Sequence, residues 1–255
     1  MTLRFGDIEY ASLQGRVPDA EWEARVSLAA LYRAVDQFGW NDLTQAPLSA
    51  RVPGEPHYLF APEGILFDEV TASSLVKIDI NGNAVDKSSL PHLKAAWWPN
   101  MAVHAARDDA NYVIHTHEDH IMALSARKER LLPVSQSAGF GIAGGIAYHP
   151  YDGVETYPER VPGLQASLGD KFVMVLENHG AMIVGPSPWL AIYLLSALQK
   201  ACRVQLLAGP SADLITLGDD ILAEMAAEIV KGPALGDSWL SLLRRLDRTD
   251  PSYRR

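Results

Sequence analysis

The stretch Tyr112-Val113-Ile114-His115-Thr116-His117 has the apolar, β-branched residues of a buried strand and carries two histidines at its end. Residues two apart in a strand point to the same face, so His115 and His117 present two imidazoles side by side while Thr116 points away. Two adjacent imidazoles on one face can bind the same metal ion as two of its ligands. Taken alone, the pair is equally consistent with two surface histidines.

A third histidine stands in Glu177-Asn178-His179-Gly180, at a tight connection between two apolar runs that predict strands. Gly180 allows a positive φ, so the turn can direct the imidazole back across the sheet; the alternative is a polar turn residue. Three nitrogens leave a coordination position open, as catalytic sites require. We therefore predict that His115, His117 and His179 bind one divalent transition metal, which would act as a Lewis acid on a substrate carbonyl.

Length and composition indicate an ordinary globular protein. The chain has 255 residues, of which 48% are hydrophobic and 21% charged, and we expect a single domain over residues 1–255. The net charge of -9 argues against nucleic acid as a partner, because nucleic-acid binders carry a clustered positive surface. We expect a small-molecule substrate instead.

The N-terminal residues indicate where in the cell the protein is located, and the cysteine content limits which atoms can bind the predicted metal. Residues 1–7 resemble neither a secretory signal nor a transit peptide, and no apolar run approaches the roughly 20 residues that span a bilayer. We therefore expect a cytoplasmic protein with no membrane partner. Cys202 is the only cysteine, which excludes an intramolecular disulfide and a thiolate metal cluster, so the predicted metal must use nitrogen and oxygen ligands.

Hydrophobic periodicity predicts helices at both ends of the chain and strands between them. The first helix should begin with Asp19 as its cap and end at Gly39. The helical tail carries apolar residues that we expect to pack on a neighbouring subunit. The predicted strands are 57–60, 75–80, 112–117, 172–176 and 181–184, and the predicted helices are 18–38, 99–107, 121–126, 188–207, 223–230 and 239–246. This order predicts an α/β fold with a central sheet covered by helices on both faces, with the strand order left open.

Three further polar residues follow the histidine pair. His120 would lie near the mouth of the site as a substrate or outer contact, or else be an exposed loop histidine. Glu118 and Asp119 are alternative bases or a fourth ligand; otherwise they form a solvated acidic turn. We count Asp119 and His120 among the candidate catalytic residues.

At the two histidine motifs the sequence resembles the class II aldolase/adducin head family, and it is closest to the adducin-like branch. The resemblance covers most of the chain. It is carried by His115-Thr116-His117, Asn178-His179-Gly180, Gly39-Trp40-Asn41-Asp42-Leu43-Thr44, Ser49-Ala50-Arg51-Val52-Pro53-Gly54, the segments 69–77 and 104–114, and the tail Leu243-Arg244-Arg245-Leu246-Asp247-Arg248.

The resemblance implies a three-layer α/β/α fold around a central, largely antiparallel mixed sheet. It also implies a homotetramer with active sites between subunits, in which His115, His117 and His179 hold zinc or, in some members, manganese or iron. Pro150-Tyr151 matches a Pro-Tyr pair whose tyrosine is the proton donor of the aldolases, so Tyr151 is the candidate general acid. The alternative is a tyrosine that simply packs at a loop.

The departures from the family pattern concern the base and the phosphate site. The glutamate of the sugar-phosphate aldolases falls at Ala96, and the two serines before it fall at Lys94 and Ala95. Their phosphate loop reads Ala46-Pro47-Leu48-Ser49 here, although Gly64 matches a glycine of a second phosphate-contacting turn. We therefore expect a non-phosphorylated substrate.

Three functions remain open on the sequence. The first is a metal-dependent carbon–carbon lyase that acts by retro-aldol cleavage or decarboxylation through an enolate, on a small hydroxy, keto or aromatic acid, with Trp97 and Trp98 lining the pocket. The second is an iron-dependent, oxygenase-like enzyme that uses the same three histidines. The third is a non-catalytic interaction module, as the resemblance to adducin heads implies. Retention of all three histidines favours a metal enzyme, and dependence on oxygen would separate the first two.

Overall fold

A single mixed sheet organises the computed structural model, which describes residues 10–85, 98–153, 158–231 and 233–255. Its strand order is β3-β2-β1-β4-β7-β6-β5, and neighbours run antiparallel except for the parallel pair β5 and β6. The strands are β1 (Leu48–Arg51), β2 (Tyr58–Phe60), β3 (Val76–Ile78), β4 (Tyr112–Thr116), β5 (Ile146–His149), β6 (Val173–Leu176) and β7 (Gly180–Gly185). The central pair β4 and β7 carries the histidine motifs.

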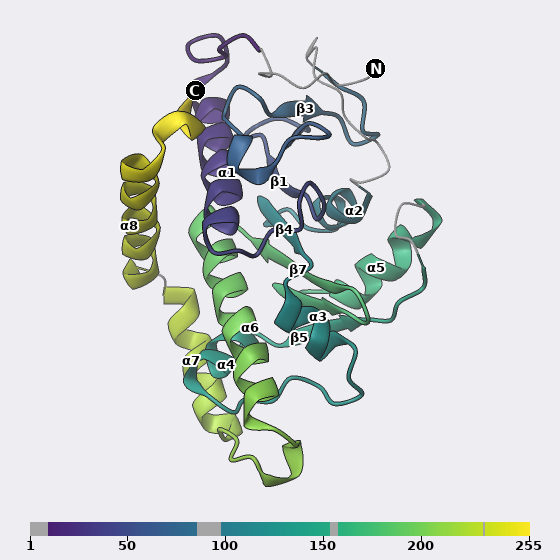
Figure 1. Ribbon diagram of the computed structural model, residues 1–255. Coiled ribbons are helices and arrows are strands. Elements are labelled where there is room, and N and C mark those ends of the chain that lie inside the picture. The colour runs from purple at the N-terminus through teal and green to yellow at the C-terminus, as the bar shows by residue number, and fades with distance from the viewer. Residues whose placement is uncertain (1–9, 86–97, 154–157, 232) are drawn as a thin grey trace.

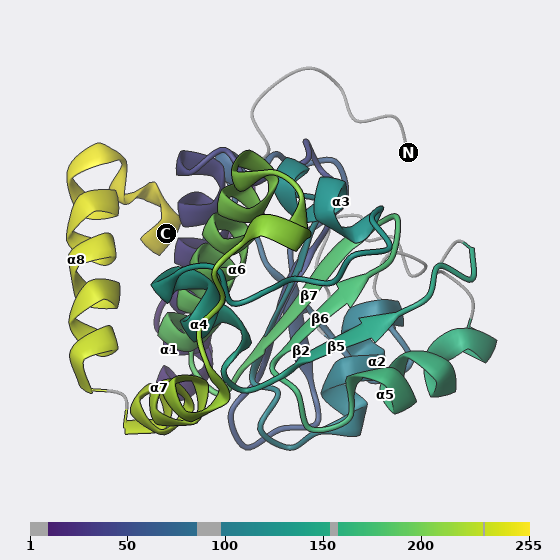
Figure 2. The same cartoon turned by 90° about the horizontal axis from the view of Figure 1, so that it is seen from below.

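Helices cover both faces of the sheet (Figures 1 and 2). The long helices α1 and α6 lie on one face, with α8 outside them, and α2 and α5 lie on the other. The helices are α1 (Asp19–Gln37), α2 (Trp98–Ala106), α3 (Asp119–Ser125), α4 (Gln136–Ile142), α5 (Val161–Leu168), α6 (Pro188–Ala208), α7 (Asp219–Lys231) and α8 (Pro233–Thr249). This is the expected three-layer α/β/α arrangement around a largely antiparallel mixed sheet.

Side chains alternate between two apolar cores along the central strands. Ile114 on β4 and Ile183 on β7 face the core shared with α1 and α6, whereas Val113 and Val184 face the smaller core under α2 and α5. A strand buried on both faces reads as a continuous apolar run, which explains the uninterrupted apolar residues before the histidine pair. His115 follows Val113 by two residues and therefore faces the α2 and α5 side.

The structure contains each predicted helix and strand and adds several short elements. β1, β5, α4 and α5 were not predicted. α4 contains two glycines that depress helix propensity, whereas length does not explain why β1 and β5 were missed, because the predicted strands β2 and β3 are shorter still.

Several predicted boundaries differ from the structure, and two of them concern residues that the sequence analysis singled out. Asp19 is not the cap of α1, because Pro18 occupies that position and no side chain caps the helix; Asp19 instead lies in the first turn, where its charge suits the helix dipole. β4 ends at Thr116, so His117 follows the strand instead of closing it.

Helix α6 is long and apolar because it lies at the centre of the fold. Its 21 residues satisfy the length and hydropathy expected of a membrane-crossing helix, contrary to the sequence-based expectation that no segment comes close. Leu195 and Leu198 are fully buried in the core between α1 and the sheet, so packing within this chain accounts for the apolar content.

The C-terminal helix α8 has a partner within the chain, so its apolar residues do not all depend on the neighbouring subunit that the sequence analysis expected for them. α8 packs against α1 and α6, with Leu246 buried and Trp239 and Leu242 partly buried against the main core. The residues after α8 close over α1: the Tyr253 side chain is fully buried, and its carbonyl accepts a hydrogen bond from the Ala72 amide.

Candidate metal centre

The three predicted histidines converge at the end of the central strands. The Nε2 atom of His117 lies 3.0 Å from Nε2 of His115 and 3.0 Å from Nε2 of His179. Three nitrogens bound to one tetrahedral ion at about 2.0–2.1 Å would be roughly 3.3 Å apart. The spacing therefore fits three ligands of one metal ion, and among the described residues these three form the one group of histidine and acidic side chains close enough to hold an ion.

The hydrogen bonds of the opposite ring nitrogens fix the tautomers of two of these histidines. Nδ1 of His115 donates to the carbonyl oxygen of Ala181 at 3.1 Å, and Nδ1 of His117 donates to a carboxylate oxygen of Asp42 at 2.8 Å. A neutral imidazole has one N–H, so both Nε2 atoms carry lone pairs. A carbonyl or carboxylate behind the ring is also the support that metal-bound histidines ordinarily have.

Two lone pairs that face each other at 3.0 Å repel unless something positive lies between them. One proton could bridge a single pair of nitrogens, whereas a metal ion accepts lone pairs from His115, His117 and His179 together. The donor set consists of three imidazole nitrogens, which suits zinc, iron, copper or nickel better than magnesium or calcium. The residues present thus fit a divalent transition metal.

Burial keeps His115 in the form that a metal requires. Its side chain is buried, and this desolvation, together with the neighbouring His117 and His179, holds the pKa of His115 well below its ordinary value. The imidazole is therefore neutral at physiological pH and presents its lone pair to the site.

A close approach between the central strands aims the third histidine. The amide of His179 donates to the carbonyl of Leu176 at 3.1 Å, which closes the turn, and Asn178 takes a positive φ of 59°. Gly180 then has φ of 156°, and a Cβ there would collide with the carbonyl oxygen of Thr116. The predicted need for glycine at this position therefore comes from the contact with β4 as well as from the backbone angle.

Of the candidate catalytic residues, Tyr151 lies beside the triad. Its ring centroid is 6.2 Å from that of His179, with the two planes at 80°. Its side chain is 53% exposed, so a substrate that enters the site can reach the phenol.

Glu118, Asp119 and His120 form the start of α3. Glu118 is buried and caps the helix: its carboxylate accepts from the amides of His120 and Ile121 and from Nδ1 of His120 at 2.7 Å. Gln199 on α6 also donates to this carboxylate, so His120 is held toward α6. Asp119 is exposed in the first turn of the helix. Glu118 therefore has a structural role that neither sequence reading described.

Asp42 contacts the histidine cluster, and the sequence reasoning did not single it out. It belongs to the loop between α1 and β1, in which Leu43 and Ala46 both adopt positive φ and the Gln45 amide donates to the Asp42 carbonyl. The sequence shows Asp42 inside a family-like stretch, but no local pattern links it to His117.

Comparison of the whole sequence with known proteins identifies the family. Residues 26–206 match the family described as Class II Aldolase and Adducin N-terminal domain. The chain belongs to this family.

Three relatives show how far the family likeness extends. A Caulobacter vibrioides protein whose name assigns it provisionally to the class 2 aldolases is 42% identical over 97% of this chain and 98% of its own length. The mouse alpha-adducin is 42% identical over 71% of this chain but only 25% of the adducin. The crystal structure of an aldolase II superfamily protein from Pseudomonas syringae superposes with a TM-score of 0.89 at 40% identity, covering 96% of this chain and all of that one.

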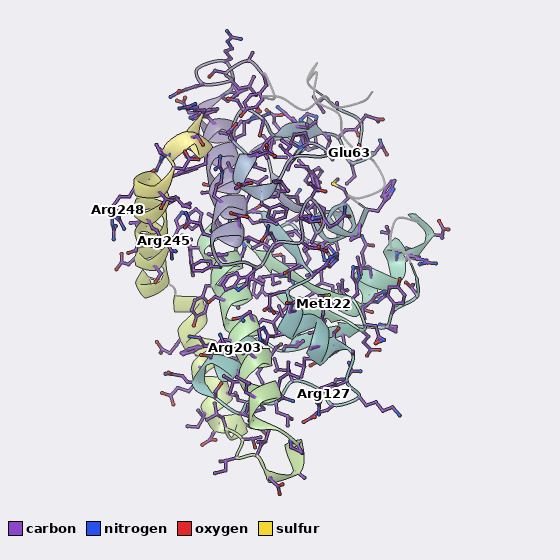
Figure 3. All side chains as sticks on the ribbon, viewed as in Figure 1. Glu63, Met122, Arg127, Arg203, Arg245 and Arg248 are labelled. Atoms are coloured by element: carbon purple, nitrogen blue, oxygen red, sulfur yellow. The ribbon has the colours of Figure 1, made fainter. Side chains whose placement is uncertain are left out.

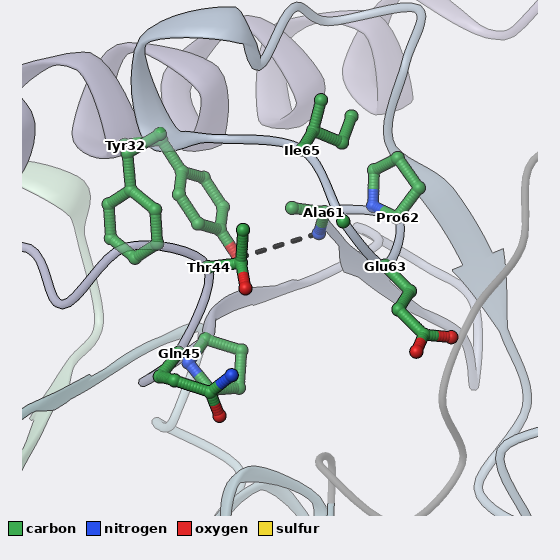
Figure 4. Close-up of a pocket in the computed structure, with 10 residues that line it drawn as sticks. Tyr32, Thr44, Gln45, Ala61, Pro62, Glu63 and Ile65 are labelled. Atoms are coloured by element: carbon green, nitrogen blue, oxygen red, sulfur yellow. Dashed lines mark hydrogen bonds between the residues drawn. The ribbon is translucent and has the colours of Figure 1, made fainter. Parts of the chain in front are cut away.

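In this class II aldolase/adducin protein a cavity of about 200 Å³ opens beside the loop that carries Asp42 (Figure 4). Tyr32 lines it, and its hydroxyl donates to the Leu48 carbonyl and accepts from the Leu48 and Ala61 amides. Thr44 and Glu63 contribute polar groups to the lining. No lysine, arginine or histidine lines it within the described part of the chain. The cavity includes Pro47 and Gly64, where the family resemblance placed the phosphate-contacting loops.

Some predicted features fall outside the described residues. These are Lys94, Ala95 and Ala96, which replace the serines and glutamate of the sugar-phosphate aldolases, and Trp97 of the proposed substrate pocket. Trp98 begins α2 and contributes to a small cavity with His149 and Arg160, away from the cavity of Figure 4.

Proposed function

We propose that the protein is a metal-dependent carbon–carbon lyase of the class II aldolase type. The observation that carries the proposal is the convergence of three imidazole Nε2 atoms, two of them with lone pairs fixed by Ala181 and Asp42. Three protein ligands leave a coordination position for a substrate oxygen, which distinguishes a catalytic from a structural site.

The bound ion would supply Lewis-acid polarisation of a substrate carbonyl. The chain's own residues would do the rest. Asp42 and the Ala181 carbonyl orient the ligand rings, and Tyr151, beside His179, would protonate the enolate that is left when the carbon–carbon bond breaks. In a retro-aldol cleavage the proton of the substrate hydroxyl would pass to Asp119 as the candidate base. Asp119 and His120 are the other candidates for proton transfer, and both lie on the first turn of α3 after the histidine pair.

We propose a small non-phosphorylated hydroxy, keto or aromatic acid as the substrate. The cavity next to the Asp42 loop supports the absence of a phosphate group, because its polar lining is formed by Thr44, Gln45 and the carboxylate of Glu63; the carboxylate of the acid would bind at the metal instead. A phosphate dianion is ordinarily held by cationic side chains or by clustered backbone amides, and a carboxylate at the cavity edge repels it.

The identity of the metal, the oligomeric state and the location are proposed from ligand chemistry and from the family likeness. We propose zinc as the ion, with manganese or iron as alternatives, because three neutral imidazoles suit zinc with an open position. A homotetramer in the cytoplasm is proposed on the family likeness, and light scattering coupled to size-exclusion chromatography would measure the assembly. A mass near four times that of the chain is expected.

Two other functions each have one supporting observation. The three-nitrogen site also suits iron, so an oxygenase-like reaction remains an alternative, and a requirement for oxygen would reveal it. The match to alpha-adducin supports a non-catalytic interaction module, which would need neither metal nor turnover.

The test begins with elemental analysis of untagged protein, purified without added metal, beside His117→Ala and the control His57→Gln. His57 pairs with Glu55 and is not part of the metal site, so this variant should keep its metal. We expect near-stoichiometric transition metal in the wild type and in His57→Gln, and none in His117→Ala.

The metal-loaded protein is then assayed against a panel of small hydroxy-keto acids, with products followed by NMR. Cleavage or decarboxylation that disappears in His117→Ala supports the lyase. A wild type that takes up no metal, or a loaded protein that turns over no member of the panel, would favour the interaction module.

A further inference from the structure

A second cavity lies far from the histidines, in the groove between α6 and α8. It has a volume of about 400 Å³, within the range of small-molecule sites, and it also reaches the C-terminal end of α1. Figure 3 shows Arg245 on the outer helix α8, which forms one wall of this groove. The site described above makes no use of it.

Aromatic side chains dominate the groove. Phe38, Trp189, Tyr193 and Trp239 all line it, and each is at least partly exposed. Phe38 is held in place from behind, because its ring stacks on Trp40 at a centroid distance of 4.6 Å and an angle of 25°. Such walls offer planar apolar surface with few rotamers to restrict on binding, which lowers the entropic cost of holding a flat ligand.

One charge accompanies these rings. Arg245 is the only charged residue among the described residues that line the groove, and its guanidinium lies over the Phe38 ring at 5.6 Å. Within the described residues Arg245 forms no ion pair, although acidic residues outnumber basic ones by 31 to 22. The neighbouring Arg244 instead donates to the hydroxyl of Ser241. An unpaired guanidinium stacked on an aromatic ring is well placed for a planar carboxylate.

We infer that this groove binds a small aromatic carboxylate. The ring of the ligand packs among Trp189, Tyr193 and Trp239, and its carboxylate accepts hydrogen bonds from the guanidinium of Arg245. The volume admits a single-ring acid with a short side chain, and charge complementarity selects the anion over a neutral aromatic of the same shape. This site is separate from the proposed metal chemistry and does not depend on it.

The test is calorimetric titration of the full-length, metal-loaded protein with phenylacetate and with its neutral isostere phenylacetamide. The variants are Arg245→Gln and the control Arg248→Gln, which removes an exposed arginine from the same helix that does not line the groove. Both positions are exposed, so both variants should fold. Repeating the titration with His117→Ala removes the metal and with it any carboxylate binding at the histidines.

We expect phenylacetate to bind the wild type, Arg248→Gln and His117→Ala alike, and to bind Arg245→Gln at least about tenfold more weakly. Phenylacetamide should bind weakly, with the same affinity for the wild type and for Arg245→Gln. Equal affinity for the two ligands, or binding that His117→Ala abolishes, would overturn the assignment. So would a wild type that binds neither ligand while Trp239→Glu lowers the oligomeric state, because the groove would then be covered by a second copy of the chain.

Discussion

Two buried histidines, His104 on α2 and His115 on β4, begin from the same chemistry and end in different roles. In both, Nδ1 donates to a backbone carbonyl, that of Ala110 at 2.7 Å for His104 and that of Ala181 at 3.1 Å for His115. Burial lowers the pKa of both, that of His104 to about 3. They differ only in what faces Nε2.

The Nε2 partner decides whether a histidine is structural or able to bind metal. Nε2 of His104 accepts from the hydroxyl of Ser49 at 2.8 Å, and that hydroxyl is free to donate because its oxygen already accepts from Asn100. Both ring nitrogens of His104 and the Ser49 hydroxyl thus have complementary partners, although the side-chain oxygen of Asn100 has none. Nε2 of His115 faces another imidazole lone pair instead, on His117. Residue type and burial alone would not separate the two sites.

The largest expected effect breaks the metal site while leaving the His104 site intact. Gly180→Ala places a methyl group against the Thr116 carbonyl in a backbone conformation that L residues avoid, so the turn must move and take His179 with it. We expect loss of bound metal and a fall in unfolding free energy of about 4 kcal/mol, from backbone strain plus overpacking. Urea unfolding and elemental analysis measure the two effects.

Gly169→Ala is the matched control for this substitution. Gly169 also has positive φ, at 52°, but a Cβ there meets no neighbouring atom. It should cost only the backbone strain, about 1 kcal/mol, and keep the metal. Equal effects of the two substitutions would show that the contact with Thr116 is unimportant.

The second prediction concerns the pH dependence of the free energy of unfolding that the buried His104 causes. His104 has a folded pKa of about 3 against an ordinary value of 6.5, so the unfolded chain binds the proton first. Its contribution to stability is complete above pH 6.5 and is lost as the pH falls from 6.5 toward 3, at about 1.4 kcal/mol per pH unit. Between pH 6 and 4 we expect the metal-free wild type to lose about 3 kcal/mol more than metal-free His104→Gln. Parallel pH dependences in urea unfolding would contradict this.

A third prediction separates metal binding from proton transfer. Tyr151→Phe removes the phenol hydroxyl beside His179 but none of the ligand nitrogens, so metal content should not change. We expect kcat on the substrate found by the screen to fall by about 100-fold or more. Asp119→Asn and His120→Gln are the comparison set. If either of these loses the rate and Tyr151→Phe keeps it, proton transfer runs through α3 instead.

The sequence anticipates that His115, His117 and His179 lie together, whereas their binding of a metal stays a prediction. Strand periodicity places His115 and His117 on one face, although β4 ends at Thr116, and turn chemistry around Gly180 brings in His179. The hydrogen-bond partners of the ring nitrogens could not be predicted in the same way, because they come from distant parts of the chain. The Ser49 hydroxyl that satisfies His104 lies 55 residues earlier in the chain, on a four-residue strand that no pattern revealed.

The C-terminal helices show the other limit of sequence patterns. An amphipathic pattern in α8 establishes that one face is apolar, but it does not say which surface covers that face. The sequence suggested a neighbouring subunit, and the structure shows that Leu246 and Leu242 of that face pack on α1 and α6 of the same chain, while packing on a subunit stays a prediction. Only the tertiary arrangement distinguishes these two solutions, because both bury the same side chains.

The smallest predicted effect concerns the residue that the sequence reasoning did not single out. Asp42 lies 75 residues before His117, on a loop with two non-glycine residues at positive φ, and holds Nδ1 of that histidine at 2.8 Å. Asp42→Asn keeps an acceptor oxygen but removes the negative charge that raises the basicity of the ligand. We expect metal affinity to fall by about 10- to 100-fold, measured by competition with a chromophoric chelator.

Asp36→Asn is the control for Asp42→Asn, because the Asp36 carboxylate also anchors this loop, accepting from the Asn41 side chain at 3.1 Å without touching a histidine. Its metal affinity should match that of the wild type. If both variants weaken metal binding equally, the loop acts by its shape and the charge of Asp42 contributes nothing specific. If only Asp42→Asn does so, then His117, like His104 and His115, owes its role to the atoms that face its two nitrogens.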